Sequence, residues 1–308
     1  MSSIPLVQGE VSTRSVRRWA WATLVANTVI ILTGGLVRLT GSGLGCPEWP
    51  RCTDQSFVPH RELGVHGVIE FGNRMLTYVL VAVVVLNVVA VWRWARSTPA
   101  LRRGAVAIAL GIPLQGVVGG ITVLTHLNPW VVALHLVLSM ALVALSVWFL
   151  LAVTDAVGAP APLGVRRATV LLQLLVWVVV YLGTVVTGSG PHAGDASAPR
   201  NGLDPQVWSH VHAAGVYALV AVTVVVWWTT RGTALHGPVT ALLGVELAQG
   251  AIGFAQYWTG LPVPLVTLHL LGAAALVAAS TRVLLLARGT SRRPATTADA
   301  PRSTPVGA

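Results

Sequence analysis

Charged side chains are scarce in this sequence, because only 10% of its 308 residues are Asp, Glu, Lys or Arg. A soluble domain typically carries about 25% of such residues. So few charges cannot cover the surface of a globule of this length, which excludes an ordinary soluble enzyme. The hydrophobic content of 54% excludes a disordered chain as well. The remaining class is an all-α polytopic membrane protein.

Lysine is absent, so all 20 basic residues are Arg, and cysteine is reduced to Cys46 and Cys52. Two cysteines are too few for a zinc or iron–sulfur site. The five residues between them include two prolines and allow a small closed loop. If this loop faces an oxidising compartment, a disulfide is expected. The pair then either staples the loop or takes part in redox chemistry, and the sequence leaves both open.

Long hydrophobic runs are the dominant feature that is present. A membrane-spanning helix needs about 20 mostly apolar residues, and eight stretches qualify. They cover residues 17–40, 65–94, 102–124, 130–153, 166–188, 206–230, 238–258 and 264–287. None shows the alternation of a barrel strand, so eight transmembrane helices are predicted. The first run ends without a small-residue cleavage site and is not a signal peptide.

The Arg residues indicate the orientation of the chain. Eight spans place both termini on one side, and that side carries all Arg except Arg38, Arg51, Arg61, Arg74 and Arg200. Positive residues favour the cytoplasmic side. We therefore expect cytoplasmic N and C termini, a multi-pass location in the cell membrane, and the Cys46–Cys52 loop on the extracytoplasmic side. The formal net charge of +10 is then a topology signal, and no nucleic-acid partner is expected.

The two halves of the chain resemble each other. Residues 115–119 match 249–253, and His135 matches His269 with the same spacing of 134 residues. A second match, of 78–83 with 217–222, aligns Asn73 with His212. Four helices in each half predict parallel repeats, built as two tandem parallel four-helix bundles. We expect a tail at 1–16, bundles at 17–153 and 166–287, a linker at 154–165, and a disordered tail at 288–308.

The repeated histidines are candidate iron ligands. His212 and His269 fall near the outer ends of their helices, where they can face each other across the second bundle. Two facing imidazoles hold a heme iron with both axial positions filled. His135 occupies the equivalent place in the first bundle. The alternative is that each histidine is a packing residue with a hydrogen-bond partner. The repetition of histidine at matched positions in both halves argues against this alternative.

The first half differs at the position that matches His212. His66, Glu70 and Asn73 share one helical stripe, so the first pocket combines a carboxylate that can move protons with an amide. The alternative is that Glu70 only pairs with Arg74. Arg38 and Arg74 lie near the outer membrane boundary, where they either bind heme propionates or extend toward the interface.

The segment 34–47, GGLVRLTGSGLGCP, resembles the first outer-loop signature of heme A synthases, as does EFGNR at 70–74, together with the two Leu-His-Leu helices. The resemblance covers residues 17–287. It implies oxidation of a heme O methyl group to a formyl group through a hydroxymethyl stage, which yields heme A for terminal oxidases.

The resemblance also implies roles for residues. Heme b would lie between His212 and His269, and the iron of the substrate heme O would bind His135. Glu70 would be essential to the reaction, and Cys46 would form a disulfide with Cys52. The implied partner is the heme O synthase that supplies the substrate, besides membrane lipid, and a homo-oligomer is left open.

One departure from the family concerns Asn73, because many members have histidine there. Either His66 replaces that ligand, or His135 alone holds the substrate iron. Two other classes remain as alternatives: a quinone-linked electron-transfer protein with bis-histidine heme, and a small transporter with parallel repeats. The first would need paired histidines in both halves. Glu246, an acidic residue in a later span, has no predicted role beyond a hydrogen bond to a neighbour.

Overall fold

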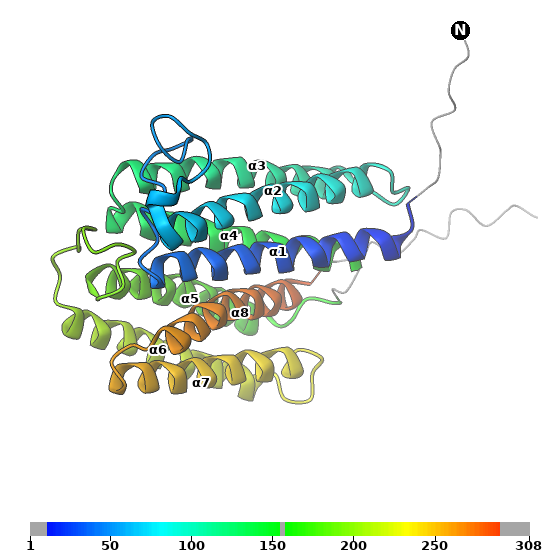
Figure 1. Ribbon diagram of the computed structural model, residues 1–308. Helices are drawn as coiled ribbons and strands as arrows, with labels where there is room; N and C mark the ends of the chain where they lie inside the picture. The colour runs from blue at the N-terminus through cyan, green and yellow to red at the C-terminus, as the bar shows by residue number, and fades with distance from the viewer. Residues whose placement is uncertain (1–10, 155–157, 290–308) are drawn as a thin grey trace, which may run out of the picture.

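The computed structural model describes residues 11–154 and 158–289, and this part of the chain is helical (Figure 1). Its α-helices are α1 (Thr13–Leu39), α2 (Gly64–Trp92), α3 (Pro99–Leu124), α4 (Pro129–Thr154), α5 (Leu163–Ser189), α6 (Pro205–Thr229), α7 (His236–Trp258) and α8 (Val263–Arg288). A short 3-10 helix, η1 (Arg61–Leu63), precedes α2. All eight α-helices are long and apolar enough to cross a membrane. The predicted all-α class with eight spans is confirmed.

Several helices begin where local chemistry satisfies their free N–H groups. The carboxylate of Asp204 accepts hydrogen bonds from the backbone N–H groups of Gln206 and Val207 at the start of α6. Thr98 caps α3 in the same way, and both helices have proline at their first position, where no N–H donor is needed. These caps fix the residues at which α3 and α6 begin.

The helix α1 begins earlier than the sequence predicted. Ser12 caps it by accepting a hydrogen bond from the Ser15 N–H, so the helix starts at Thr13 and not at residue 17. Hydropathy detects only the apolar part of a helix, whereas a cap extends it through polar residues. The remaining parts of the predicted tails, 1–10 and 290–308, and residues 155–157 of the linker lie outside the described residues.

Each half of the chain forms a ring of four neighbouring helices. In the first half α1 contacts α2 and α4, and α3 contacts α2 and α4. In the second half α5 contacts α6 and α8, and α7 contacts α6 and α8. Diagonal partners, α2 with α4 and α6 with α8, therefore face each other across a ring. The exact domain boundaries and the membrane orientation stay predictions.

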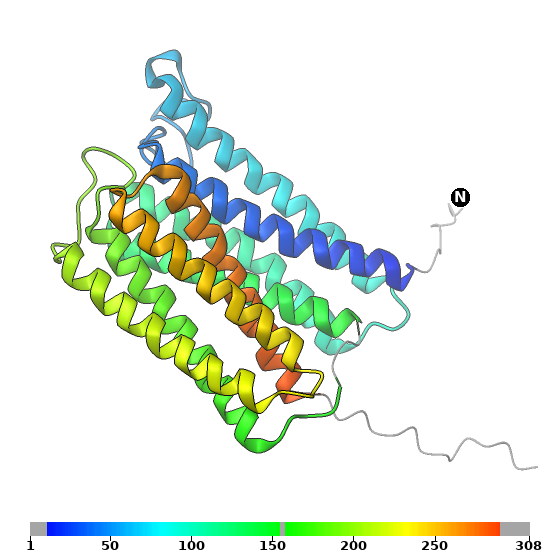
Figure 2. The ribbon, with the colours of Figure 1, turned by 90° about the horizontal axis from the view of Figure 1, so that it is seen from below.

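The two halves meet along α1, α4, α5 and α8 (Figures 1 and 2). Buried Ile31, Met140 and Val143 of the first half belong to the same hydrophobic cluster as Leu172 and Val277 of the second. A separate cluster, which includes Val16, Val91 and Phe149, fills the part of the first half near the start of α1. Large apolar side chains such as Leu110, Tyr78 and Tyr217 stay exposed on the outer surface, as expected for side chains that face lipid. The shared cluster fixes the two halves against each other.

Candidate functional site

Two imidazoles face each other inside the second half. The ring centroids of His212 on α6 and His269 on α8 are 6.5 Å apart, and the ring planes are inclined by 71°. These helices are diagonal partners, so the rings meet across the middle of the ring of helices. Metal–imidazole bonds are about 2 Å long, so this separation leaves room for one metal ion between two rings. The structure brings together the two residues that the repeat singled out.

A glycine of the preceding helix lies against each of these rings. A Cβ atom added to Gly183 on α5 would stand 3.3 Å from Cε1 of His212. A Cβ atom added to Gly253 on α7 would stand 3.7 Å from Cε1 of His269. The first contact is tight and the second is ordinary. The glycines thus allow the imidazoles to lie close to the neighbouring helix backbone.

The first half repeats this arrangement with one change. His135 on α4 packs its Cε1 atom against Gly119 on α3, where an added Cβ would stand 3.2 Å away. Gln115 on α3 donates hydrogen bonds to the His135 carbonyl at 3.2 Å and to Ser139 Oγ at 3.0 Å, which ties α3 to α4 beside the ring. On α2, the position that matches His212 holds Asn73. The first half therefore offers one imidazole and one amide.

Buried polar atoms without partners mark both pockets. Within the described residues, Nδ1 of His135 and His269 and Oδ1 of Asn73 are buried without a hydrogen-bond partner, whereas the His212 ring interacts with the Val179 backbone of α5. Buried polar atoms normally have a partner, so an unpaired one is compatible with a ligand, ion or water that completes its hydrogen bonding. The histidines and Asn73 occupy repeat-related positions, so each half presents polar side chains that fit a ligand with a metal centre. An iron porphyrin, with an apolar plate and a metal centre, meets this description.

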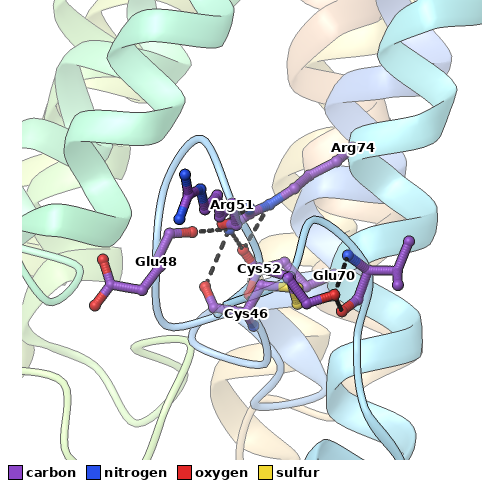
Figure 3. Close-up of a disulfide and its surroundings, with 8 residues drawn as sticks. Cys46, Glu48, Arg51, Cys52, Glu70 and Arg74 are labelled. Atoms are coloured by element: carbon purple, nitrogen blue, oxygen red, sulfur yellow. Dashed lines mark hydrogen bonds and ion pairs between the residues drawn. A yellow bond between two sulfur atoms is a disulfide. The ribbon is translucent and has the colours of Figure 1, made fainter. Parts of the chain in front are cut away.

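Glu70 and Arg74 of α2 hold the outer loop that contains the two cysteines (Figure 3). Glu70 Oε2 accepts a hydrogen bond of 2.7 Å from the Cys46 N–H, while its Oε1 receives Arg74 Nη2 at 2.6 Å. Arg74 also donates to the carbonyl oxygens of Cys46, Glu48 and Arg51 at 2.9–3.0 Å. Glu70 is 5% exposed, so its hydrogen bonds are buried and charge-assisted. We call Glu70 and Arg74, with their hydrogen bonds to the loop, the latch. The predicted pairing of Glu70 with Arg74 is present, and the proton-transfer role stays a prediction.

The cysteine loop itself is closed by a disulfide between Cys46 and Cys52, both fully buried. The predicted disulfide is present. Trp49 from this loop packs its indole directly against Gly120 of α3, so closely that an added Cβ would overlap the ring. Gly119 and Gly120 thus serve two neighbours, the ring of His135 and the ring of Trp49. Sequence reasoning missed this docking, because no periodicity relates Trp49 to α3.

Arg38, at the end of α1, connects the two halves at their outer ends. Its Nε donates to the His192 carbonyl at 2.6 Å and its Nη2 to the Thr187 carbonyl at 3.1 Å. The backbone adds a hydrogen bond from the Gly43 N–H to the Gly194 carbonyl at 2.8 Å. Binding of a heme propionate by Arg38 or Arg74 stays a prediction. In the structure both side chains donate hydrogen bonds to backbone carbonyl groups of the connecting segments.

His66 lies apart from the bundle interior. The residue is exposed, and its Nδ1 forms a 2.8 Å hydrogen bond with the buried Ser42 hydroxyl. It lines an open pocket of about 450 Å³ with Gly41, Gly45, Leu63 and Asp195, among others. Hydrogen bonds from the hydroxyl and the backbone N–H of Ser197 lower the pKa of Asp195. The structure does not bring His66 into contact with Asn73, although both belong to α2.

Other histidines have ordinary structural partners. His210 hydrogen-bonds the Gln206 carbonyl at 2.7 Å and lies edge-on to Tyr257. His192 bonds the Leu261 carbonyl at 2.9 Å. The structure therefore distinguishes His210 from His212, because residues two positions apart on an α-helix point about 200° apart.

Glu246 on α7 is a second buried carboxyl group. It is 2% exposed, its Oε1 accepts a 2.7 Å hydrogen bond from the Thr223 hydroxyl on α6, and its Oε2 has no partner among the described residues. The expected hydrogen bond to a neighbour is present. The repeat puts Ile112 and Val84, both buried, at the equivalent positions of the first half. This polar pair is therefore specific to the half with two facing imidazoles.

The fold and the placement of the histidines define a helical membrane protein with imidazoles at repeat-related positions. A family model described as cytochrome oxidase assembly protein, COX15-CtaA, matches residues 17–66 and 61–281. Because these matches cover most of the sequence, the chain belongs to the COX15-CtaA family.

Curated relatives agree with this family. The chain is 30% identical over 219 residues to a heme A synthase of Methylobacterium radiotolerans, an alignment that covers 60% of the chain and 59% of that relative. It is 27% identical to a heme A synthase of Methylorubrum extorquens strain PA1, over 95% of the chain and 91% of the relative. A heme A synthase of Geobacillus thermodenitrificans is 28% identical, with 92% and 95% covered.

Proposed function

We propose that this protein is a heme A synthase, an oxidoreductase that converts a methyl group of heme O to a formyl group through a hydroxymethyl stage. The observation that carries the proposal is the 6.5 Å separation of the His212 and His269 rings, together with an equivalent pocket that has only one imidazole. One half then keeps a resident heme, and the other receives a heme as substrate. Membership of the COX15-CtaA family and the similarity to relatives named heme A synthase support the activity.

In the second half, His212 and His269 would hold heme b by its iron. A heme with both axial positions filled supplies electron transfer and no site for a further ligand. The residues around it fix the imidazoles, because Gly183 and Gly253 let the rings lie against the helix backbone. The buried Glu246–Thr223 pair lies in the same half, deeper along α6 and α7. This half is therefore suited to carry electrons away from the substrate.

In the first half, His135 would bind the iron of heme O. Gly119 and the Gln115 hydrogen bonds hold the helix segment that presents this imidazole. Oxidation of a methyl group releases protons as well as electrons, and Glu70 is the carboxylate on the α2 stripe that also carries Asn73. We assign proton acceptance to Glu70, besides its hydrogen bond to the Cys46 N–H.

The outer loop would cover this pocket from the extracytoplasmic side. Arg74 donates hydrogen bonds to three carbonyl groups of the loop, and Trp49 packs the loop against α3. Arg38 stands at the same outer end, where the carboxylates of a porphyrin would meet a cation. The side of the membrane follows from the Arg distribution, and the heme O synthase that supplies the substrate is the expected partner.

Heme extraction tests this function. The chain is expressed with a heme O synthase in a bacterial host that makes no heme A, and total heme is separated by chromatography. We expect heme A to accumulate together with the hydroxymethyl intermediate. A bis-histidine electron-transfer protein would give a Soret band with heme O unchanged, and a transporter would give a protein without extractable heme. Either result would exclude the proposal.

A further inference from the structure

The position that faces the substrate heme opposite His135 is filled by an amide. The repeat aligns Asn73 with His212, which is the residue that faces His269 in the second half. α2 and α4 are diagonal partners in their ring, as α6 and α8 are in theirs. Asn73 therefore stands across the first bundle from His135 in the way that His212 stands across the second from His269.

The Asn73 side chain keeps a free polar atom in this place. Its Oδ1 is buried and has no partner among the described residues, and its Nδ2 is 3.9 Å from a Cβ built on Gly34 of α1. A carboxamide has two donors and an acceptor. It is not among the axial ligands that proteins use for heme iron, which are His, Cys, Met and Tyr. Asn73 can therefore hydrogen-bond a ligand of the iron but leaves the iron itself uncoordinated on this side.

His66 does not fill the vacancy in the ligand set. It lies two turns of α2 from Asn73, which is about 10 Å along the helix axis, toward the outer end. Its Nδ1 is hydrogen-bonded to Ser42, and the residue is exposed in the outer pocket. A heme whose iron reached His66 would have to leave the level of His135.

We propose that the first pocket holds its heme through His135 alone, with an open axial position on the Asn73 side that admits a small neutral diatomic ligand. The donor to that ligand is the Nδ2 amide group of Asn73, because a diatomic ligand can only accept a hydrogen bond and the Oδ1 atom cannot donate one. In the second half His212 closes the same position. This inference rests on the proposed function, because it presupposes a heme in the first half. According to this proposal, Asn73 leaves the axial position of the first half open, whereas His212 fills the matching position of the second half.

Carbon monoxide is the probe, because it binds ferrous heme only where an axial position is free. Purified protein is loaded with excess hemin, freed of unbound heme and reduced with dithionite, and its CO difference spectrum is titrated. We expect one CO per chain that carries two hemes. Asn73→His should abolish CO binding with two hemes retained, and His212→Asn should allow both hemes to bind CO. The His66→Ala variant should give the same CO titration as the wild-type protein.

The outcomes separate the inference from the proposed function. A chain with two hemes that is inert to CO, or an Asn73→His variant that still binds CO, would overturn the open position while leaving the first-half heme intact. Loss of the first-half heme in His66→Ala would identify His66 as a ligand and overturn it as well. A chain that takes up only the His212–His269 heme under excess hemin would contradict the substrate pocket itself. The absorption of the His212–His269 heme reports the folding of the Asn73 variant.

Discussion

The imidazoles of His212 and His269 face each other across the second helix ring with their centroids 6.5 Å apart. They come from helices that do not touch, and each ring lies against a glycine of the helix before it. The buried Nδ1 atom of His269 has no hydrogen-bond partner among the described residues, and the His212 ring meets the Val179 backbone of α5. Two buried imidazoles at this separation are suited to bind one metal centre between them.

The first prediction concerns this pair. If His212 and His269 hold heme b as we propose, His269→Ala removes one of its ligands, so this heme should become five-coordinate or be lost and the low-spin bis-histidine spectrum should disappear. His210→Ala is the matched control. His210 lies two residues before His212 on the same helix, but its ring is hydrogen-bonded to the Gln206 carbonyl and does not face His269. Absorption and electron paramagnetic resonance spectra of the purified proteins check both. An unchanged low-spin signal in His269→Ala would remove His269 from the ligand set.

The second prediction concerns the latch on the cysteine loop. Glu70→Gln keeps an oxygen for the Cys46 N–H but removes the charge that Arg74 binds. Hydrogen bonds to charged groups contribute about 1.5–3 kcal/mol, so amide exchange in residues 46–52 should accelerate by roughly 10-fold or more.

Activity separates two roles for Glu70. If Glu70 only holds the loop, Arg74→Ala should accelerate exchange and lower heme A formation to the same extent as Glu70→Gln. If Glu70 also accepts a proton, Glu70→Gln should lower heme A formation further at comparable exchange rates. Slow exchange in both variants would show that the latch is not what holds the loop.

The third prediction concerns the docking of Trp49. Gly120→Ala puts a methyl group into the indole ring of Trp49 and should detach the loop from α3. Gly244→Ala, in the interior of α7, meets nothing within 4 Å and is the matched control for helix propensity. Trp fluorescence is ambiguous with 12 Trp in the chain, so proteolysis of the loop is the better readout. Equal cleavage of both variants would refute the docking role.

Much of the site follows from the sequence, because the repeat relates distant residues without a structure. Matching segments identified His135, His212 and His269 and exposed the substitution at Asn73. The contacts of Arg74 with three loop carbonyls and of Trp49 with Gly120 did not follow. They depend on the path of an irregular loop, which has no period. Glu246 had an overlooked signal, since the repeat pairs it and Thr223 with the aliphatic Ile112 and Val84.

The fourth prediction concerns Glu246. One of its oxygens is buried without a partner, so Glu246→Leu, which approaches the composition of the first half, should raise the thermal stability of the protein. Thr223→Val removes the donor to Oε1 and should destabilise by about 1–3 kcal/mol. Scanning fluorimetry of the proteins in detergent measures their unfolding temperatures, which should rise for Glu246→Leu and fall for Thr223→Val. A Glu246→Leu protein that is less stable than the wild type would contradict the view of Glu246 as an unsatisfied group.

The most direct test of the whole account is turnover in the purified protein. Heme O is loaded into the wild type and into His135→Ala, an electron acceptor and oxygen are supplied, and the hemes are identified by mass spectrometry over time. We predict that the wild type forms the hydroxymethyl and then the formyl product, while His135→Ala forms neither and keeps the heme held by His212 and His269. Wild-type protein that binds heme O and returns it unchanged, or a fully active His135→Ala variant, would contradict the account.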